Sequence, residues 1–153
     1  MRQRNRLHVR LAGTLAATAL LFGAMAASSD ATRTISLNET GRLRLVSKHG
    51  FTLNETGTAS GTIKGPISVR LTIVSTSRVS VEVTLSPNGG SVSGSGTASY
   101  HKGETEASFS GGLSIAKRSG SYAHAQGAGL KFSGTIARSN DAITVYVSGR
   151  LSY

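Results

Sequence analysis

Apolar and polar residues alternate along most of the chain after about residue 50, between short clusters of Gly, Ser, Asn and Pro. In residues 67–73, Ile, Val, Leu and Ile alternate with Ser, Arg and Thr, and residues 79–85 repeat the pattern with Val, Val, Val and Leu. A period of two is typical of strands with one buried face, and helical spacing is nowhere sustained. The pattern therefore predicts an all-β chain.

The two clearest runs predict a hairpin joined by a five-residue loop over residues 74–78. With this loop, Val69 faces Val83 and Arg70 faces Glu82. Apolar side chains then oppose apolar ones on one face, and opposite charges meet on the other, as a correct register requires.

Glycine and alanine occupy many inward positions of the strands predicted on either side of this hairpin. Gly57 is expected near Ile73 across the turn at residues 64–66, and Gly96 is expected to meet Phe109. An aromatic ring can cover a glycine inside a strand. Glycines within strands mark bends or close approach of backbones, so they indicate a strongly curved sheet with a narrow interior.

Further alternating rows run through residues 107–115, 130–136 and 143–151, and Ser139-Asn140-Asp141 is expected to turn the last pair. Before Glu55 the pattern is weaker, and Ile35 with Leu37 and Leu43 with Leu45 are expected to supply one or two more strands. We predict a single antiparallel, up-and-down β-barrel of roughly eight strands, because closure removes exposed strand edges. A two-sheet β-sandwich has the same alternation and is the alternative.

Residues 1–26 have the pattern of an export signal: four arginines within the first ten residues, an uncharged stretch, and the small residues of Ala24-Met25-Ala26. An uncleaved membrane anchor is disfavoured because the stretch is rich in Ala and shorter than the roughly 20 apolar residues of a span. We expect a secreted or cell-envelope protein with no stable membrane insertion after cleavage. Residues 27–50 are assigned to an N-terminal leader or first strands, and residues 51–153 to the β-barrel domain.

The 153 residues suffice for one domain, and the absence of Cys excludes disulfides. Without residues 1–26, 13 basic and 7 acidic residues remain, for a formal charge of +6. The basic residues are scattered singly, which does not favour nucleic acid as a partner, since nucleic-acid surfaces gather their Lys and Arg. Attraction to an anionic envelope polymer stays open.

The chain has few residues with catalytic or metal-binding patterns. His49, His101 and His124 lack the spacing of zinc ligands. Glu104 and Glu106 lie two positions apart, which suits a solvated strand edge better than an acid and base pair. No nucleophile elbow or phosphate loop is present. We expect no catalytic residue, no metal and no cofactor.

Four residues are the candidate ligand contacts at a barrel mouth, namely Tyr100, Tyr122, His124 and Arg138. The predicted interior rows consist almost wholly of Val, Ile, Leu, Phe, Gly and Ala, with no carboxylate among them.

Two segments repeat the same pattern, Ser36-Leu37-Asn38-Glu39-Thr40-Gly41 and Thr52-Leu53-Asn54-Glu55-Thr56-Gly57. Both contain an Asn-x-Thr acceptor for glycosylation. The spacing does not continue, which argues against a solenoid, and we interpret the two segments as a repeated strand and turn.

A resemblance to a known superfamily appears in residues 119–129, Ser-Gly-Ser-Tyr-Ala-His-Ala-Gln-Gly-Ala-Gly, and 132–136, Phe-Ser-Gly-Thr-Ile. They resemble the Gly-x-aromatic-x-x-Ala-x-Gly turn and following strand of the allene oxide cyclase and dirigent barrels. Small secreted actinobacterial proteins of unknown function look more similar still. The resemblance spans roughly residues 50–153. It implies an eight-stranded antiparallel barrel, often a trimeric homo-oligomer, whose interior in the plant enzymes holds an apolar or phenolic substrate.

Three hypotheses for the function follow. The first is a secreted, non-catalytic barrel that binds an apolar small molecule or a cell-envelope component. The second is a cyclase- or isomerase-like enzyme acting on an apolar substrate in the barrel, favoured by a cavity of roughly 300 Å³ or more with two convergent polar groups. A packed interior would exclude it. The third is a polyanion-binding surface protein.

Overall fold

The computed structural model describes residues 32–153, which form nine β-strands. The predicted export signal, residues 1–26, lies outside the described residues. Among residues 32–153 there is no helix of the length and hydropathy needed to cross a membrane. The strands are β1 (Thr34–His49), β2 (Thr52–Gly61), β3 (Gly65–Ser75), β4 (Arg78–Leu85), β5 (Gly90–Lys102), β6 (Glu106–Gly112), β7 (Ser114–Gly120), β8 (Gln126–Ala137) and β9 (Ile143–Ser152).

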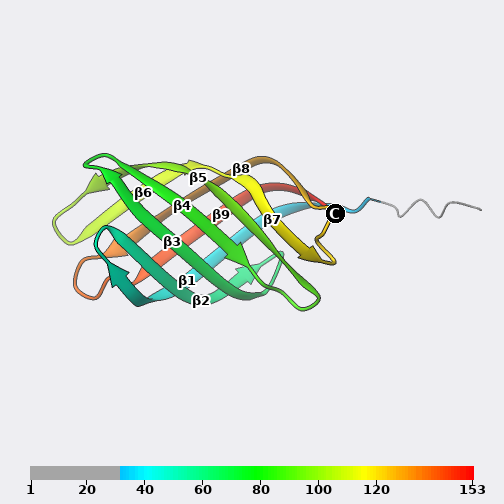
Figure 1. The fold of residues 1–153 in the computed structure, drawn as a ribbon, viewed down its shortest axis with the longest axis horizontal. Coiled ribbons are helices and arrows are strands. Elements are labelled where there is room, and N and C mark those ends of the chain that lie inside the picture. The colour runs from blue at the N-terminus through cyan, green and yellow to red at the C-terminus, as the bar shows by residue number, and fades with distance from the viewer. Residues whose placement is uncertain (1–31) are drawn as a thin grey trace, which may run out of the picture. The chain divides into compact units, whose positions relative to one another are not determined.

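Eight of the strands close into an antiparallel barrel. Hydrogen bonds connect them in the order β4-β3-β2-β1-β9-β8-β6-β5, and pairing of β5 with β4 completes the circle. Figure 1 shows the strands crossing the long axis of the barrel obliquely, as closure of a sheet requires. The all-β prediction and the barrel are confirmed, and the sandwich alternative is wrong because the strand order has no break between two sheets.

The ninth strand, β7, lies outside the closed barrel. It pairs with residues 90–95 of β5, whereas β6 pairs with residues 98–102 of the same strand edge. Leu113 separates β6 from β7, and its N–H donates to the carbonyl oxygen of Leu130 at 2.9 Å. The meander is therefore interrupted at this point.

The weakly patterned segment before residue 50 forms one long strand, β1, which pairs with both β2 and β9. Leu37 and Leu43 are buried as expected, but Glu39 and Gly41 occupy the inward positions between them. These two residues interrupt the apolar alternation, which is why the sequence indicated only two short pieces.

The register predicted for β3 and β4, which a short connection joins, is confirmed. Val69 pairs with Val83, and Arg70 pairs with Glu82. Gly94 also lies opposite Val83, on the other side of β4. The β3–β4 turn is shorter than the five residues expected, since β3 extends to Ser75 and β4 begins at Arg78.

The register predicted between β2 and β3 is wrong. Gly57 pairs with Ile67, not with Ile73. The reason lies in the connection: β2 ends at Gly61, whose φ of +145° suits glycine, and Ile63 is buried, with its N–H donating to Glu39 Oε1. A tight turn over residues 64–66 would have left this apolar side chain on the strand.

The predicted contact between Gly96 and Phe109 is also wrong, because Phe109 pairs with Tyr100. A side chain at Gly96 would overlap the carbonyl oxygen of Gly112, where β6 ends. The Phe109 ring instead covers Gly134 on β8. A Cβ added to Gly134 would lie 2.5 Å from this ring. The principle of an aromatic ring over a strand glycine holds, with a different glycine.

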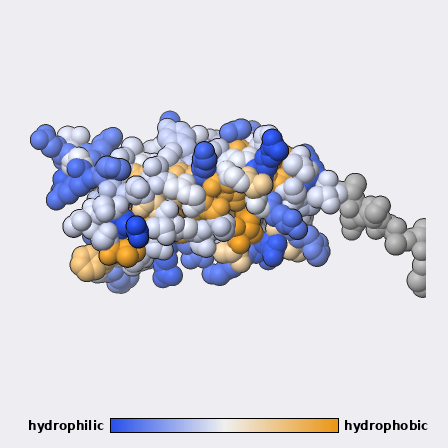
Figure 2. All heavy atoms as spheres, turned by 90° about the horizontal axis from the view of Figure 1, so that it is seen from above, coloured by the Kyte–Doolittle hydropathy of each residue, from blue (hydrophilic) through white to orange (hydrophobic). Residues whose placement is uncertain are grey.

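The barrel interior is filled by side chains through its middle and at the end nearer the C-terminus. In the middle, the rings of Phe109 and Phe132 pack at a tilt of 37°, with ring centroids 5.4 Å apart. A void of only about 20 Å³ remains among residues such as Leu37, Val83 and Leu151. Outside, residues of intermediate to hydrophilic character cover most of the face shown in Figure 2, and apolar residues appear in its middle and at its lower left edge.

Candidate functional site

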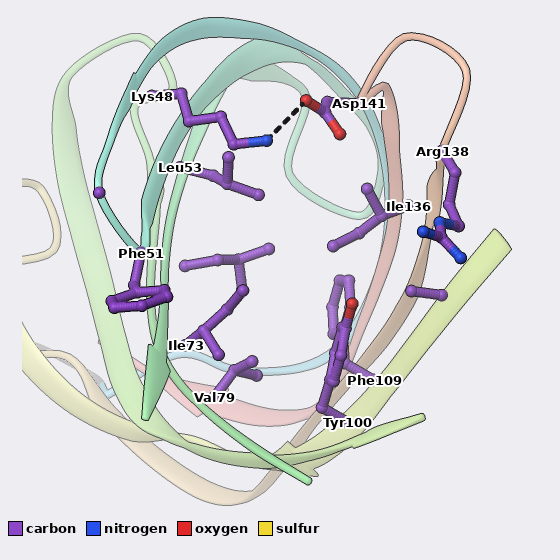
Figure 3. Close-up of a pocket in the computed structure, with 13 residues that line it drawn as sticks. Lys48, Phe51, Leu53, Ile73, Val79, Tyr100, Phe109, Ile136, Arg138 and Asp141 are labelled. Atoms are coloured by element: carbon purple, nitrogen blue, oxygen red, sulfur yellow. Dashed lines mark hydrogen bonds and ion pairs between the residues drawn. The ribbon is translucent and has the colours of Figure 1, made fainter. Parts of the chain in front are cut away.

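A cavity of about 350 Å³ opens at the end of the barrel opposite the C-terminus. The β1–β2, β3–β4, β5–β6 and β8–β9 turns surround this end (Figure 1). Figure 3 shows the cavity between side chains that project from opposite walls. Its lining consists of Lys48, Gly50, Phe51, Leu53, Leu71, Ile73, Val79, Tyr100, Ala107, Phe109, Ile136, Arg138 and Asp141.

Strand alternation explains why the cavity walls are apolar. Leu53 pairs with Leu71 across β2 and β3, and Ala107 pairs with Ile136 across β6 and β8. All four are buried, inward-facing residues of their strands. The polar lining residues come from strand ends and turns, where alternation no longer holds them to one face.

The charged groups at the rim have partners. Lys48 Nζ lies 3.3 Å from Asp141 Oδ2, and Arg138 Nη1 donates to the carbonyl oxygen of Gly103 at 2.9 Å. The Asn140 side chain accepts the N–H of Ala142 and so holds the turn that carries Asp141. The dashed line in Figure 3 marks the ion pair across the rim.

A buried carboxyl group lies next to the cavity. Glu55, on β2, is only 1% exposed, and neither carboxyl oxygen has a hydrogen-bond partner. It follows Leu53 by two residues and therefore occupies the next inward position, opposite Leu45 of β1 and Val69 of β3. Burial raises the pKa of Glu55 from 4.5 to about 7, and the negative charge of Asp141 acts in the same direction.

A second inward carboxyl group, Glu39, lies farther from the cavity. It is 3% exposed, Oε1 accepts the N–H of Ile63, and Oε2 has no partner. Burial raises the pKa of Glu39, while hydrogen bonds from the backbone of Ile63 and Thr62 oppose this effect. This carboxyl group therefore stabilises the conformation of the β2–β3 connection in which the Ile63 side chain is buried.

The expectation of an interior without carboxylates is thus wrong. The two repeated segments lie wholly within β1 and β2, so their interpretation as strand and turn is also wrong. In each, a buried Leu is followed two positions later by a buried Glu, as in Leu37 and Glu39 and again in Leu53 and Glu55. Continuing the period of two from each leucine would have placed the glutamate that follows it on the inward face.

The structure does not bring the four predicted contact residues into one site. Tyr100 and Arg138 line the mouth cavity. Tyr122 and His124 follow the end of β7, which pairs with the opposite end of β5. There Tyr122 is buried against Tyr153, with ring centroids 4.7 Å apart, and His124 is exposed. The role of these residues in ligand binding stays a prediction.

Within the described part of the chain, no three His, Asp or Glu side chains gather as metal ligands would. Glu104 and Glu106 are exposed beside the β5–β6 turn.

No protein-family model, no curated protein and no solved structure matches the chain. The barrel architecture therefore stands without a family assignment, and function has to be argued from the site.

Proposed function

We propose that the protein is a secreted β-barrel that binds a small, largely apolar molecule in the mouth cavity. The main supporting observation is the cavity of about 350 Å³ at one end of an otherwise packed barrel, with apolar side chains on its walls and charged side chains at its rim. This volume falls within the range of small-molecule sites, which combine apolar walls with a few polar groups. Secretion rests on the sequence of residues 1–26.

The surroundings of the cavity support an apolar ligand. Phe51 is 74% exposed at the rim, and Val46 and Val74, near the same ends of β1 and β3, are also exposed. Of these three, Phe51 lines the cavity and continues its apolar surface outwards. A lipid-like component of the cell envelope is an occupant that this surface suits, because such a molecule could pass from a membrane or carrier without full exposure to water.

The test is titration with a neutral, apolar dye whose fluorescence rises on burial. Ala107→Phe places a ring in the cavity and should weaken dye binding at least tenfold. Ala116→Phe, at an exposed position of β7, is the matched control and should bind the dye as the wild type does. Thermal unfolding of both variants checks that the barrel persists. Absence of dye binding by the wild type, or unchanged binding by Ala107→Phe, would overturn the proposal.

A second candidate function is catalysis of an isomerase- or cyclase-like proton transfer in the same cavity. It is favoured by Glu55, because a carboxyl group with a pKa of about 7 can exchange a proton near neutral pH. The volume of the cavity, about 350 Å³, also exceeds the roughly 300 Å³ expected of an enzyme that acts on an apolar substrate in the barrel. Native mass spectrometry of protein from its own host would identify a carried molecule. Chemical change of that molecule on incubation with wild type but not Glu55→Gln would establish catalysis, whereas unaltered recovery would exclude it.

A further inference from the structure

Glu55 is the one carboxyl group next to the cavity that has no hydrogen-bond or ion-pair partner in the described residues. The rim charges of Lys48, Asp141 and Arg138 all have partners. Among buried side-chain atoms of residues 32–153, those without partners are both oxygens of Glu55 and one oxygen of Glu39. An unpaired buried carboxyl group is strongly unfavourable, so its presence calls for a partner that the chain does not supply.

The position of Glu55 indicates where such a partner would come from. Leu53 and Leu71 line the cavity and pair with each other, and Glu55 pairs with Val69 one inward layer below them. Glu55 is therefore not part of the cavity lining but belongs to the inward layer that follows it. Glu39, by contrast, is bound to the β2–β3 connection and is directed to the packed end.

The unpartnered Glu55 carboxyl group favours a cationic partner over other polar groups. Glu55 experiences the negative charge of Asp141, which lines the rim above it. Asp141 is already paired with Lys48 at 3.3 Å, so the Glu55 carboxylate itself is the group that would attract a positive charge and repel a carboxylate. An ammonium group also has only donors to offer, and a carboxylate only acceptors, so the two are complementary.

We propose that Glu55 recognises the head group of the ligand, and that the ligand is an amphiphile with a primary ammonium head and an apolar body. The head lies against the Glu55 carboxylate, and the body fills the cavity towards Phe51 at the rim. This inference rests on the proposed function and specifies the ligand class of the same site.

The test compares three probes of equal chain length at pH 8, namely octylamine, octanol and octanoate, by displacement of the neutral dye. For the wild type, octylamine should displace the dye at a concentration at least tenfold below that of octanol, and octanoate should be weakest. In the Glu55→Gln variant, octylamine should displace the dye only at the concentration that octanol requires, and the concentration that octanol requires should stay the same. Dye binding by this variant demonstrates that it is folded.

Glu82→Gln is the matched control, because Glu82 lies on the outer face of β4 in an ion pair with Lys117 at 3.0 Å. It should keep the preference for octylamine. Equal displacement by the three probes, or a preference that survives Glu55→Gln, overturns the ammonium proposal while leaving the cavity function intact. If neither the dye nor any probe binds the wild type, the proposed function itself fails, and the ammonium proposal fails with it.

Discussion

The buried carboxyl group of Glu55 makes the stability of the barrel depend on pH. Its pKa is about 7 in the folded protein and 4.5 by ordinary values, so the folded chain binds more protons than the unfolded chain between these two pH values. The free energy of unfolding is therefore highest below about pH 4.5 with respect to this group, decreases as pH rises through about 7, and is constant above.

The magnitude follows from the same two values. The interval from 4.5 to about 7 corresponds to roughly 3 kcal/mol of unfolding free energy lost between the two plateaus. For a domain of this size, that loss amounts to a decrease of about 10 °C in Tm. Burial is the main cause, so replacing the carboxyl group by an amide of nearly the same shape removes the effect without removing the side chain.

The measurement is urea-induced unfolding at several pH values from 4.5 to 8, for wild type, Glu55→Gln and Glu106→Gln. The wild type and Glu106→Gln, whose substituted residue is exposed, should lose stability together across this range. Glu55→Gln should show a curve flatter by about 3 kcal/mol. Glu39 contributes to all three curves in the same direction, so the difference between variants isolates Glu55.

Two results would refute this reasoning. If the wild-type stability were constant from pH 4.5 to 8, the carboxyl group would have to be solvated or paired in the folded protein. If Glu55→Gln kept the full wild-type dependence, the titrating group would be another residue.

Three further predictions concern packing and hydrogen bonds in the barrel. Glu39→Ala should lower the free energy of unfolding by about 2 kcal/mol in urea titrations, because the buried N–H of Ile63 loses its acceptor; an unchanged value would show that water replaces the carboxylate. Gly134→Ala should destabilise by more than about 2 kcal/mol, since its Cβ would overlap a backbone carbonyl oxygen and a phenyl ring, whereas Gly112→Ala, with its nearest atom at 3.7 Å, should change stability by less than about 1 kcal/mol. Equal effects would contradict the assigned contacts. Lys48→Ala should lower the free energy of unfolding by less than about 1 kcal/mol, with a correspondingly small decrease in Tm, because its ion pair is exposed. A larger loss would indicate a structural role for the rim.

The strands and the closely connected registers could be predicted from the sequence because they depend on local information. Alternation with a period of two distinguishes the inward from the outward face within any one strand. Across a short turn, the pairing of Val69 with Val83 follows from matching those faces. The same reasoning predicted eight strands and closure, since short antiparallel connections leave few other arrangements.

The registers across longer connections could not be predicted in the same way. Ile63 leaves β2 to fill the end of the barrel, and Leu113 leaves the strand edge where β7 separates from β6. Both displacements depend on groups from strands that are distant in the sequence, namely the Glu39 side chain and the backbone carbonyl of Leu130. Matching of neighbouring faces contains no information about these partners.

Alternation alone therefore determined that this chain is all-β with one mainly apolar face on each strand, because each strand has to bury one face, and the strand pairing decided for the barrel against the sandwich. Tertiary structure decided where the barrel interior is filled and where it is hollow. The filling depends on the summed volumes of side chains that face one another across the barrel, and these come from different strands. It also decided that Glu55 is enclosed. A period of two from Leu53 places this residue on an inward face, but only the closed barrel removes it from water, and this burial raises the pKa of its carboxyl group to about 7.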